Sequence, residues 1–484
     1  MPTRSLHLTD DSAQGQLAAV LAAIPTTLGL ARDFPPDVDA EAQVLADAPP
    51  LPPDEPGTDR TDIEFVTIDP AGSTDLDQAL AIERDGGGWR VFYAIADVPA
   101  FVHPGGAIDG ETRERGQTIY AADGRIPLHP VVISEGAASL LPDQLRGAFV
   151  WDMQLDASGV VTSASVARGR VRSRRQLDYV GAQASLDAGT GPDAAMLGLL
   201  RDVGEARVVQ EAARGGASLN TPEVLVTFSG ESYGLERRAM LPIESWNAQI
   251  SLMTGMAAAQ LMLDGKVGIL RTMPPADEFS VSRFRRQATA LGRPWPEEQR
   301  YGDYLRDLDG TNPQHLAILH AASSLFRGAG YTPFDGSIPE NTIQSAVGAP
   351  YAHVTAPLRR LVDRFGLAIS EALSAGETPP EWARRALPEL PKIMARTSNV
   401  ANQLDRRTLD SVEAALLSGR VGETFDAVVV SRGKSGATVQ LTDPDVEATL
   451  DDVGTGTRPD PGTDVRVRLD TADVATGTVR FSVA

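Results

Sequence analysis

The chain has 484 residues, no cysteine and a formal net charge of −21. This length is too great for one ordinary hydrophobic core, so we expect a large central domain with smaller modules attached. The missing cysteines exclude disulfides, thiolate catalysis and cysteine-bound zinc, and the acidic balance argues against a nucleic-acid binder with a broad basic surface.

The first 48 residues are predicted to form a small helical module. Residues 13–30 are rich in Ala and Leu and form a helix that Pro25 breaks, and residues 39–46 form a second, short helix. A helix-turn-helix arrangement is one option, although no basic recognition helix is present. Residues 49–60 are rich in proline and are predicted to be a linker.

Residues 61–420 are predicted to form one central domain of mixed sheet and helix, so the fold class is α+β. Strand-like segments dominate from residue 62 to about residue 155. Helical periodicity dominates later, most clearly in residues 245–263, 281–291, 313–326, 357–373 and 400–417.

Residues 421–484 return to short β segments, which are TFDAVVVS, GATVQLT, VEATL, DVRVRLD and GTVRFSV. Five strands in a segment of this length predict a small OB-fold barrel, and such barrels commonly bind oligonucleotides. The barrel segment is acidic, and the few residues that suit RNA contact are Phe425, Phe481, Arg432 and Lys434.

No segment resembles a membrane anchor or an export signal. No apolar run approaches the roughly 18 residues that a membrane span needs. The opening segment is acidic where a secretion signal would be basic and then apolar. We therefore predict a cytoplasmic protein with no membrane partner, and the sequence identifies no protein partner.

An aspartate motif follows the first strong strand of the central domain, with Asp69, Asp75 and Asp77 around the buried Leu76. The alternation of an extended chain places Asp75 and Asp77 on one face. Such crowding of like charges is costly without a cation, and oxygen ligands favour Mg²⁺, Mn²⁺ or Ca²⁺. Mg²⁺ keeps positions open for phosphate oxygens, which suits phosphodiester cleavage. A calcium loop or a solvent-facing acidic turn is the alternative.

An arginine motif, TAPLRR, begins the predicted helix 357–373. Pro357 suits a first helical turn and Thr355 lies near the cap, so free N–H groups would face a phosphate. Arg359 and Arg360 would extend that site, because arginine binds phosphate with paired hydrogen bonds. The alternative is that both arginines pair with Asp363 or with other acids of the helix.

Four blocks together resemble the RNB family of exoribonucleases, to which ribonuclease II and ribonuclease R belong. They occur in order as TIDPAGSTDLDQA, YAIADVPAFVHPGGAIDGETRERGQTIY, RIPLHPVVISEGAASLLP and YAHVTAPLRRLVD. The resemblance implies an RNB catalytic domain, an S1-like C-terminal barrel and a Mg²⁺-dependent enzyme, with Mn²⁺ as a substitute. It also implies processive 3′-to-5′ hydrolysis of single-stranded RNA to nucleoside 5′-monophosphates.

The resemblance also assigns roles at the metal site. Asp69, Asp75 and Asp77 match the first three aspartates of the family pattern and would hold the metal, with Asp75 and Asp77 catalytic and Asp77 the most critical. Gln78 stands at the fourth position. Its amide oxygen can still be a metal ligand, but it brings no charge.

For RNA, the resemblance implies that Tyr120 stacks on the 3′-terminal base, an interaction that tolerates any base. Arg359 matches the arginine that holds the scissile phosphate, and Arg360 would assist it. An acidic family residue on the last helix of the domain corresponds to Asp405, with Glu413 as the alternative. The second aromatic clamp of the family, expected near residues 270–276, is missing.

The predicted function is therefore a 3′-to-5′ exoribonuclease. Gln78 motivates a rival, a catalytically weakened RNB homologue that binds RNA or regulates. A third interpretation, a metal hydrolase acting on small phosphodiesters, fits the acidic composition but leaves the barrel without a role.

Overall fold

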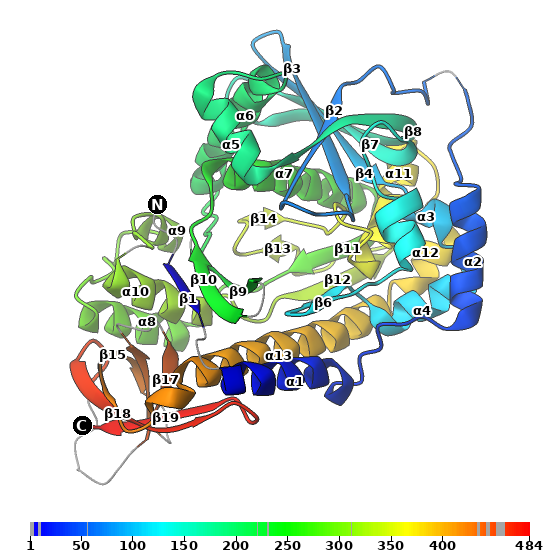
Figure 1. The fold of residues 1–484 in the computed structure, drawn as a ribbon. Helices are drawn as coiled ribbons and strands as arrows, with labels where there is room; N and C mark the ends of the chain where they lie inside the picture. The colour runs from blue at the N-terminus through cyan, green and yellow to red at the C-terminus, as the bar shows by residue number, and fades with distance from the viewer. Residues whose placement is uncertain are drawn as a thin grey trace.

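A computed structural model describes residues 4–7, 11–55, 57–219, 221–229, 232–310, 312–432, 436–441, 446–451 and 460–484. Two closed β-barrels lie at opposite ends of the molecule, with helices and short sheets between them (Figure 1). The mixture of helix and sheet confirms the predicted α+β class, and the boundaries predicted at residues 48, 60 and 420 stay predictions.

The barrel of the central region has the strand order β2-β3-β4-β7-β8, with β2 parallel to β8 and the other pairs antiparallel. Its strands are β2 (Phe65–Asp69), β3 (Gln78–Asp85), β4 (Gly88–Ala96), β7 (Leu145–Leu155) and β8 (Val161–Asp178). Alternate residues of β4 enter two different cores, since Tyr93 packs with residues of α7 (Pro242–Gly265) whereas Phe92 packs with residues of α2 (Pro36–Asp47) and α3 (Val98–Phe101). Burial on both faces fixes the barrel against its neighbours.

Helices surround this barrel on several sides (Figure 1). The helices of this part of the chain are α3 (Val98–Phe101), α4 (Ala107–Arg115), α5 (Tyr179–Ala188), α6 (Ala194–Ala213), α7 (Pro242–Gly265), α8 (Glu278–Ala290), α9 (Tyr301–Arg306), α10 (Pro313–Ala322), α11 (Leu361–Ser374), α12 (Glu381–Ala386) and α13 (Leu390–Leu417), with short turns of other helix types at Ile133–Ala137, Ser323–Leu325 and Ser418–Arg420. Of these, α8, α9 and α10 lie beside the C-terminal barrel instead (Figure 1). The predicted helices at 245–263, 281–291, 313–326 and 400–417 are thereby confirmed.

Short sheets interrupt the region in which helical periodicity dominates. They pair β9 (Glu223–Ser229) with β10 (Ser232–Arg238), β11 (Val267–Thr272) with β12 (Gly330–Asp335), and β13 (Ile343–Gln344) with β14 (Ala349–Pro350). An earlier hairpin, β5 (Ile119–Ala121) with β6 (Gly124–Ile126), lies against α13 and becomes important for the site.

The N-terminal module contains the two predicted helices, α1 (Asp11–Thr27) and α2 (Pro36–Asp47). It is not entirely helical, because β1 (Arg4–His7) pairs with β10. The prediction that Pro25 breaks the first helix is wrong, since Pro25 lies in the last turn of α1. Leu17 and Leu21 of α1 pack with Leu404 of α13 in one buried cluster, and this burial offsets the hydrogen bond that proline removes.

The C-terminal barrel confirms the predicted strands and fold. Its order is β15-β16-β17-β19-β18, and its strands are β15 (Thr424–Arg432), β16 (Gly436–Leu441), β17 (Glu447–Asp451), β18 (Asp464–Asp473) and β19 (Thr478–Val483). Phe425 and Phe481 pack edge to face in its core with ring centroids 5.8 Å apart, so the expectation that they suit RNA contact is wrong. Arg432 pairs with Asp460, and Lys434 lies outside the described residues.

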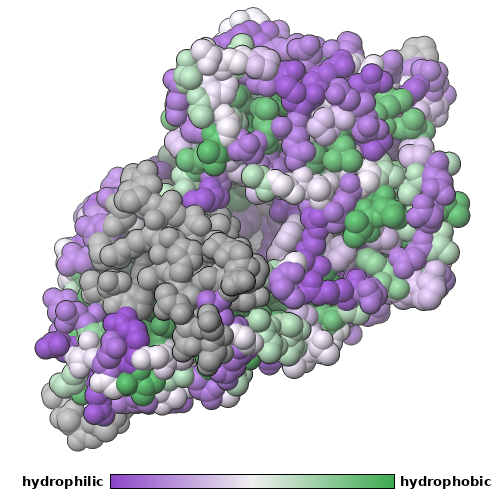
Figure 2. Space-filling view, viewed as in Figure 1, coloured by the Kyte–Doolittle hydropathy of each residue, from purple (hydrophilic) through white to green (hydrophobic). Residues whose placement is uncertain are grey.

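Apolar residues form separate patches among hydrophilic ones on the face shown in Figure 2. None of the described helices is both long enough and apolar enough to cross a membrane. The predicted cytoplasmic location stays a prediction.

Candidate active site

The aspartate loop, residues 70–77, connects β2 to β3 at one end of the central barrel. The Leu76 side chain is fully buried between Asp75 and Asp77. The Leu76 N–H donates to the Ser139 hydroxyl oxygen at 2.9 Å, which anchors the loop from inside. Asp75 and Asp77 are therefore presented from a fixed backbone on either side of an apolar anchor.

Asp77 is the most buried of the three aspartates, with 4% exposure. Its Oδ1 accepts a hydrogen bond from the Leu358 N–H at 2.7 Å, and its Oδ2 lies 3.3 Å from Nε of Arg359. Burial raises the pKa of Asp77 to about 8 against the opposing effects of Arg359 and the Leu358 N–H. Burial likewise raises the pKa of Asp69 to about 6, and Asp75 contributes further. Both carboxyls need more positive charge than the protein supplies.

Asp75 has protein partners at both oxygens. Arg125 Nη1 lies 2.8 Å from Oδ1, and the Tyr120 hydroxyl donates to Oδ2 at 3.3 Å. Both partners come from the β5–β6 hairpin. The hairpin thus lies over the aspartate loop and places the predicted stacking residue directly beside it.

Gln78, the neutral fourth residue of the motif, is bound at both ends of its amide. Its Nε2 donates to the Thr355 carbonyl oxygen at 2.6 Å, and its Oε1 accepts from the Tyr93 hydroxyl at 2.5 Å. The Ser251 hydroxyl lies at 3.5 Å from the same Oε1. The role of Gln78 as a metal ligand stays a prediction, and a metal would compete with these hydrogen bonds.

The arginine loop, residues 355–360, is not the start of a helix. Helix α11 begins at Leu361, so the prediction of a helix from residue 357, with its free N–H groups ready for phosphate, is wrong. The reason is tertiary contact, because the N–H of Leu358 donates to Asp77 and the N–H of Ala356 donates to Asp363 Oδ1 at 2.7 Å. The aspartates take the hydrogen bonds that were predicted for a ligand.

The two arginines of this loop have different surroundings. Arg360 forms two hydrogen bonds with the fully buried Asp363, at 2.9 and 2.7 Å, as the alternative interpretation required. Arg359 instead has 46% of its side chain exposed and lies 3.3 Å from Asp77 at Nε. Arg359 is therefore the arginine that remains available to a phosphate.

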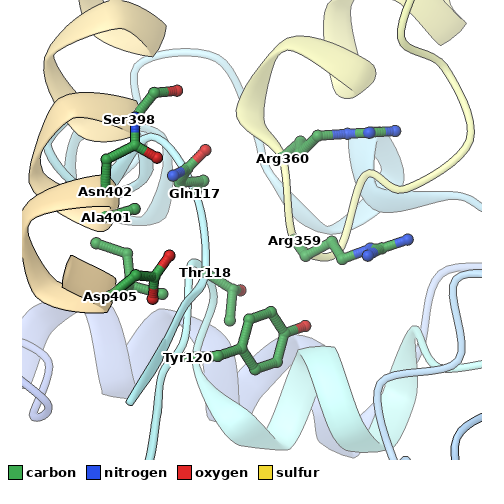
Figure 3. Close-up of a pocket in the computed structure, with 10 residues that line it drawn as sticks. Gln117, Thr118, Tyr120, Arg359, Arg360, Ser398, Ala401, Asn402 and Asp405 are labelled. Carbon is green, nitrogen blue, oxygen red and sulfur yellow. The ribbon is translucent and has the colours of Figure 1, made fainter. Parts of the chain in front are cut away.

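A pocket of about 370 Å³ brings the remaining candidates together. Tyr120, Arg359, Arg360 and Asp405 all line it. In Figure 3 Asp405 extends from α13 on one side, the arginine loop lies on the other, and the Tyr120 ring lies between them. Burial raises the pKa of Asp405. The pocket includes Asp405 and not Glu413 among its lining residues, which favours the first of the two acidic candidates.

Other residues of the site were not singled out in the sequence. Asn402 lines the pocket one helical turn before Asp405, a spacing that could have identified it. Gln117 lines it next to the hairpin. Arg125 is the first residue of the third family block, but its contact with Asp75 had no sequence signal, because that contact depends on the register of a hairpin with three-residue strands.

The aspartates fit a hard divalent cation by their chemistry. Their donors are all oxygen, and two desolvated carboxyls with raised pKa values lack compensating charge. As they stand, no three His, Asp or Glu side chains in the part of the chain that the structure describes are arranged to hold a metal ion. Asp75 is engaged by Arg125 and Asp77 by Arg359, so a cation held by all three aspartates requires these arginines to turn away.

Comparison with protein families gives two matches. The RNB domain matches residues 58–367, and the RNase II-type exonuclease C-terminal S1 domain matches residues 423–484. Ribonuclease R of Escherichia coli is 25% identical over 412 residues, which cover 80% of this chain and 50% of that protein. The exosome complex exonuclease RRP44 homolog A of Arabidopsis thaliana is 27% identical over 348 residues, covering 67% and 37%. The chain thus spans half or less of the length of these relatives.

Solved structures share the fold at lower identity. Mycoplasma genitalium RNase R in complex with ribose-methylated single-stranded RNA has a TM-score of 0.85 at 17% identity, over 97% of this chain and 78% of that chain. Yeast Ssd1, described as a pseudonuclease, has a TM-score of 0.67 at 16% identity, over 87% and 52%. The fold therefore occurs in both a named ribonuclease and a named pseudonuclease, and activity has to be argued from the site.

Proposed function

The chain belongs to the RNB family, and on that premise we propose that it is a Mg²⁺-dependent, processive 3′-to-5′ exoribonuclease. Its substrate is single-stranded RNA and its products are nucleoside 5′-monophosphates. The observation that carries the proposal is the contact of Arg359 with Asp77 beside a pocket that Tyr120 also lines. An arginine that can bind phosphate, a carboxylate of the aspartate motif and an aromatic ring that can stack on a base thus lie together around a site for one nucleotide.

Each group has a chemical task in this proposal. Arg359 leaves Asp77 and binds the scissile phosphate, since its exposed side chain has room to turn. Asp69, Asp77 and the released Asp75 would hold the divalent cation, which would supply charge neutralisation and acidify a bound water. The Tyr120 ring stacks on the terminal base, and stacking is worth about 1–3 kcal/mol per base.

Asp405 faces this ring from α13 and acts as an acceptor for the terminal ribose hydroxyls. A 3′ end offers two neighbouring hydroxyl donors, and RNA differs from DNA at the 2′ position. The Mycoplasma RNase R with this fold is in complex with ribose-methylated single-stranded RNA, which supports RNA as the ligand. Asp405 is thereby proposed as the residue that recognises the ribose.

A cleavage assay tests the proposal. Purified protein is incubated with 5′-labelled single-stranded RNA, in Mg²⁺ or in EDTA, beside an Asp77→Asn variant. We expect a Mg²⁺-dependent ladder that shortens from the 3′ end, and a loss of at least about 100-fold in rate for Asp77→Asn, because a central metal ligand is removed. Asp202→Asn is the matched control, since Asp202 pairs with Arg84 on the surface.

The rival function has its own outcome in the same assay. Retention of RNA without products by the unmodified chain, at every Mg²⁺ concentration, would replace the enzyme by an RNA-binding homologue. Hydrolysis of a small phosphodiester with no action on RNA would favour the third interpretation instead.

A further inference from the structure

The β5–β6 hairpin engages Asp75 with two side chains at once. Tyr120 of β5 and Arg125 of β6 are directly opposed in the hairpin register, so their side chains lie on the same face. Tyr120 contacts one oxygen of Asp75 and Arg125 the other. The negative charge of Asp75 is therefore already paired with a positive charge of the hairpin.

Arg125 has a second acid within reach. Its Nη2 forms an ion pair with Glu135 and also donates to the Thr74 hydroxyl oxygen at 2.6 Å. The Thr74 hydroxyl in turn donates to Glu135 at 2.7 Å. Side-chain exposures of 28% for Arg125, 14% for Asp75 and 17% for Glu135 place the whole group in partial shelter from water. The guanidinium is shared between one candidate metal ligand and one acid outside the ligand set.

The hairpin itself is held from its outer side by the N-terminal segment. Arg32 pairs with Asp123 in the hairpin turn. Arg115 donates to the Pro127 carbonyl oxygen at 3.1 Å and to the Ala31 carbonyl oxygen at 3.0 Å, so one guanidinium joins the two segments. With the backbone held in this way, rotation of the Arg125 side chain can break the Asp75 contact without moving the hairpin.

We propose that Arg125 is a positioning residue that competes with the divalent cation for Asp75 and keeps only its ion pair with Glu135 when the cation binds. The inference rests on the proposed function for the identity of the metal site. It follows from the geometry because the positive guanidinium on Asp75 Oδ1 opposes a second cation on the same carboxylate, and Glu135 can keep the displaced guanidinium neutralised. Arg125 then sets how much cation is needed before Asp75 becomes a ligand.

Direct binding of Mn²⁺, measured by electron paramagnetic resonance of the free ion without RNA, tests this proposal. Arg125→Met removes the competitor and is expected to tighten the Mn²⁺ dissociation constant by roughly three- to ten-fold, the size of one partly sheltered ion pair. Glu135→Gln leaves Arg125 with Asp75 alone and is expected to weaken binding by a similar factor. Arg84→Met, which removes a surface arginine paired with Asp202, is the control and should leave binding unchanged.

The double variant separates competition from a general charge effect. If Glu135 acts through Arg125, adding Glu135→Gln to Arg125→Met should change the dissociation constant by less than about twofold, because coupled residues are not additive. Additive effects would overturn the proposal, because each residue would then act only by its charge. Unchanged binding in a folded Arg125→Met protein would also overturn it, and so would absence of Mn²⁺ binding in both the unmodified chain and this variant.

The result is independent of RNA cleavage. A chain that cleaves no RNA but binds Mn²⁺ more tightly after Arg125→Met would end the exonuclease proposal and support the role of Arg125. A chain that cleaves RNA but binds Mn²⁺ equally well before and after Arg125→Met would support the exonuclease proposal and end the proposed role of Arg125. If Arg125→Met does not fold, Glu135→Gln alone still decides, since unchanged binding there contradicts the proposal.

Discussion

Asp77 and Asp75 are separated by one residue, yet different parts of the molecule hold them. Asp77 accepts from a backbone N–H of the arginine loop and is almost fully buried, whereas Asp75 is held by side chains of the β5–β6 hairpin. A backbone donor cannot turn away, but an arginine side chain can. We call the arginine loop with Asp77 the fixed side of the site, and the β5–β6 hairpin with Asp75 the hairpin side. The comparison teaches that the fixed side sets the geometry of the site, whereas the hairpin side can change its contacts when a ligand binds.

The largest expected effect comes from substituting the two arginines of the fixed side, Arg359 and Arg360, one at a time. Arg359→Ala should lower the turnover of RNA by at least about 100-fold, because it removes the donor proposed for the developing phosphate charge. The free energy of unfolding should change less than in Arg360→Ala, since Arg359 is half exposed and Asp77 keeps its hydrogen bond from the Leu358 N–H. Arg360→Ala is the matched variant, and it should instead lower the free energy of unfolding by on the order of 3 kcal/mol by leaving the buried Asp363 unpaired.

Single-turnover kinetics and urea denaturation of both variants check this contrast. Equal losses of turnover at similar stability would contradict the assignment of different tasks to Arg359 and Arg360. A loss of stability in Arg359→Ala as large as that in Arg360→Ala would contradict it as well.

This contrast also shows what the sequence could predict. Helix α7 was expected at residues 245–263 and is found at Pro242–Gly265, because a long periodic pattern determines a helix locally. The helix after Thr355 starts four residues later than expected, because Asp77, 281 positions before Leu358 in the chain, accepts the Leu358 N–H. A contact between such distant segments has no local signature, and local rules therefore failed at the site.

The candidate residues divide in the same way. Tyr120 and Arg359 could be named from motif blocks, and Asp405 from its place on the last helix of the domain; the structure brings all three to one pocket. The contact of Arg125 with Asp75 could not be predicted, because it depends on which residues face each other across a very short hairpin. Residue type was readable from the sequence, whereas the pairing of side chains required the fold.

The next largest expected effect is a pH dependence of the free energy of unfolding, which we assign to His129. It follows the hairpin, is fully buried, and its Nδ1–H donates to the Leu358 carbonyl oxygen at 3.0 Å. Burial lowers the pKa of His129 to about 4 from its ordinary 6.5. Between these values the unfolded chain binds a proton that the folded chain does not, so stability is complete above pH 6.5 and falls as the pH drops toward 4.

The test compares the unmodified chain with His129→Asn, whose amide can still donate a hydrogen bond but does not titrate. Urea denaturation at pH 7.5 and pH 5 should show that the variant loses about 2 kcal/mol less stability on acidification. The same loss in both proteins would show that protonation of His129 is not the cause of the lower stability at pH 5.

Gln78 tests whether the fixed side depends on a neutral residue. Gln78→Asp removes the donor to the Thr355 carbonyl oxygen and should lower the free energy of unfolding by about 1–3 kcal/mol. We also expect no decrease in the Mg²⁺ concentration that gives half-maximal rate, because Gln78 serves the arginine loop. Gln176→Asp is the control, since Gln176 donates to the Ser73 carbonyl from an exposed position and should cost little. A lower Mg²⁺ requirement in Gln78→Asp would restore the ligand role predicted from the sequence.

The smallest expected effect lies on the hairpin side, at the hydroxyl of Tyr120. The Tyr120 side chain is exposed, with 52% exposure of the residue, so its ring is accessible to a base while its hydroxyl reaches Asp75 at a weak 3.3 Å. Tyr120→Phe should therefore change the affinity for a short single-stranded RNA by less than about threefold, whereas Tyr120→Ala should weaken it by about ten-fold or more through the loss of stacking. Fluorescence anisotropy in the Asp77→Asn background measures both without cleavage. Equal losses in the two variants would mean that Tyr120 acts through its hydroxyl contact with Asp75 and not through its ring. Tyr120 would then belong with the groups that hold the aspartate loop in place, and not with the groups of the hairpin side that respond to a ligand.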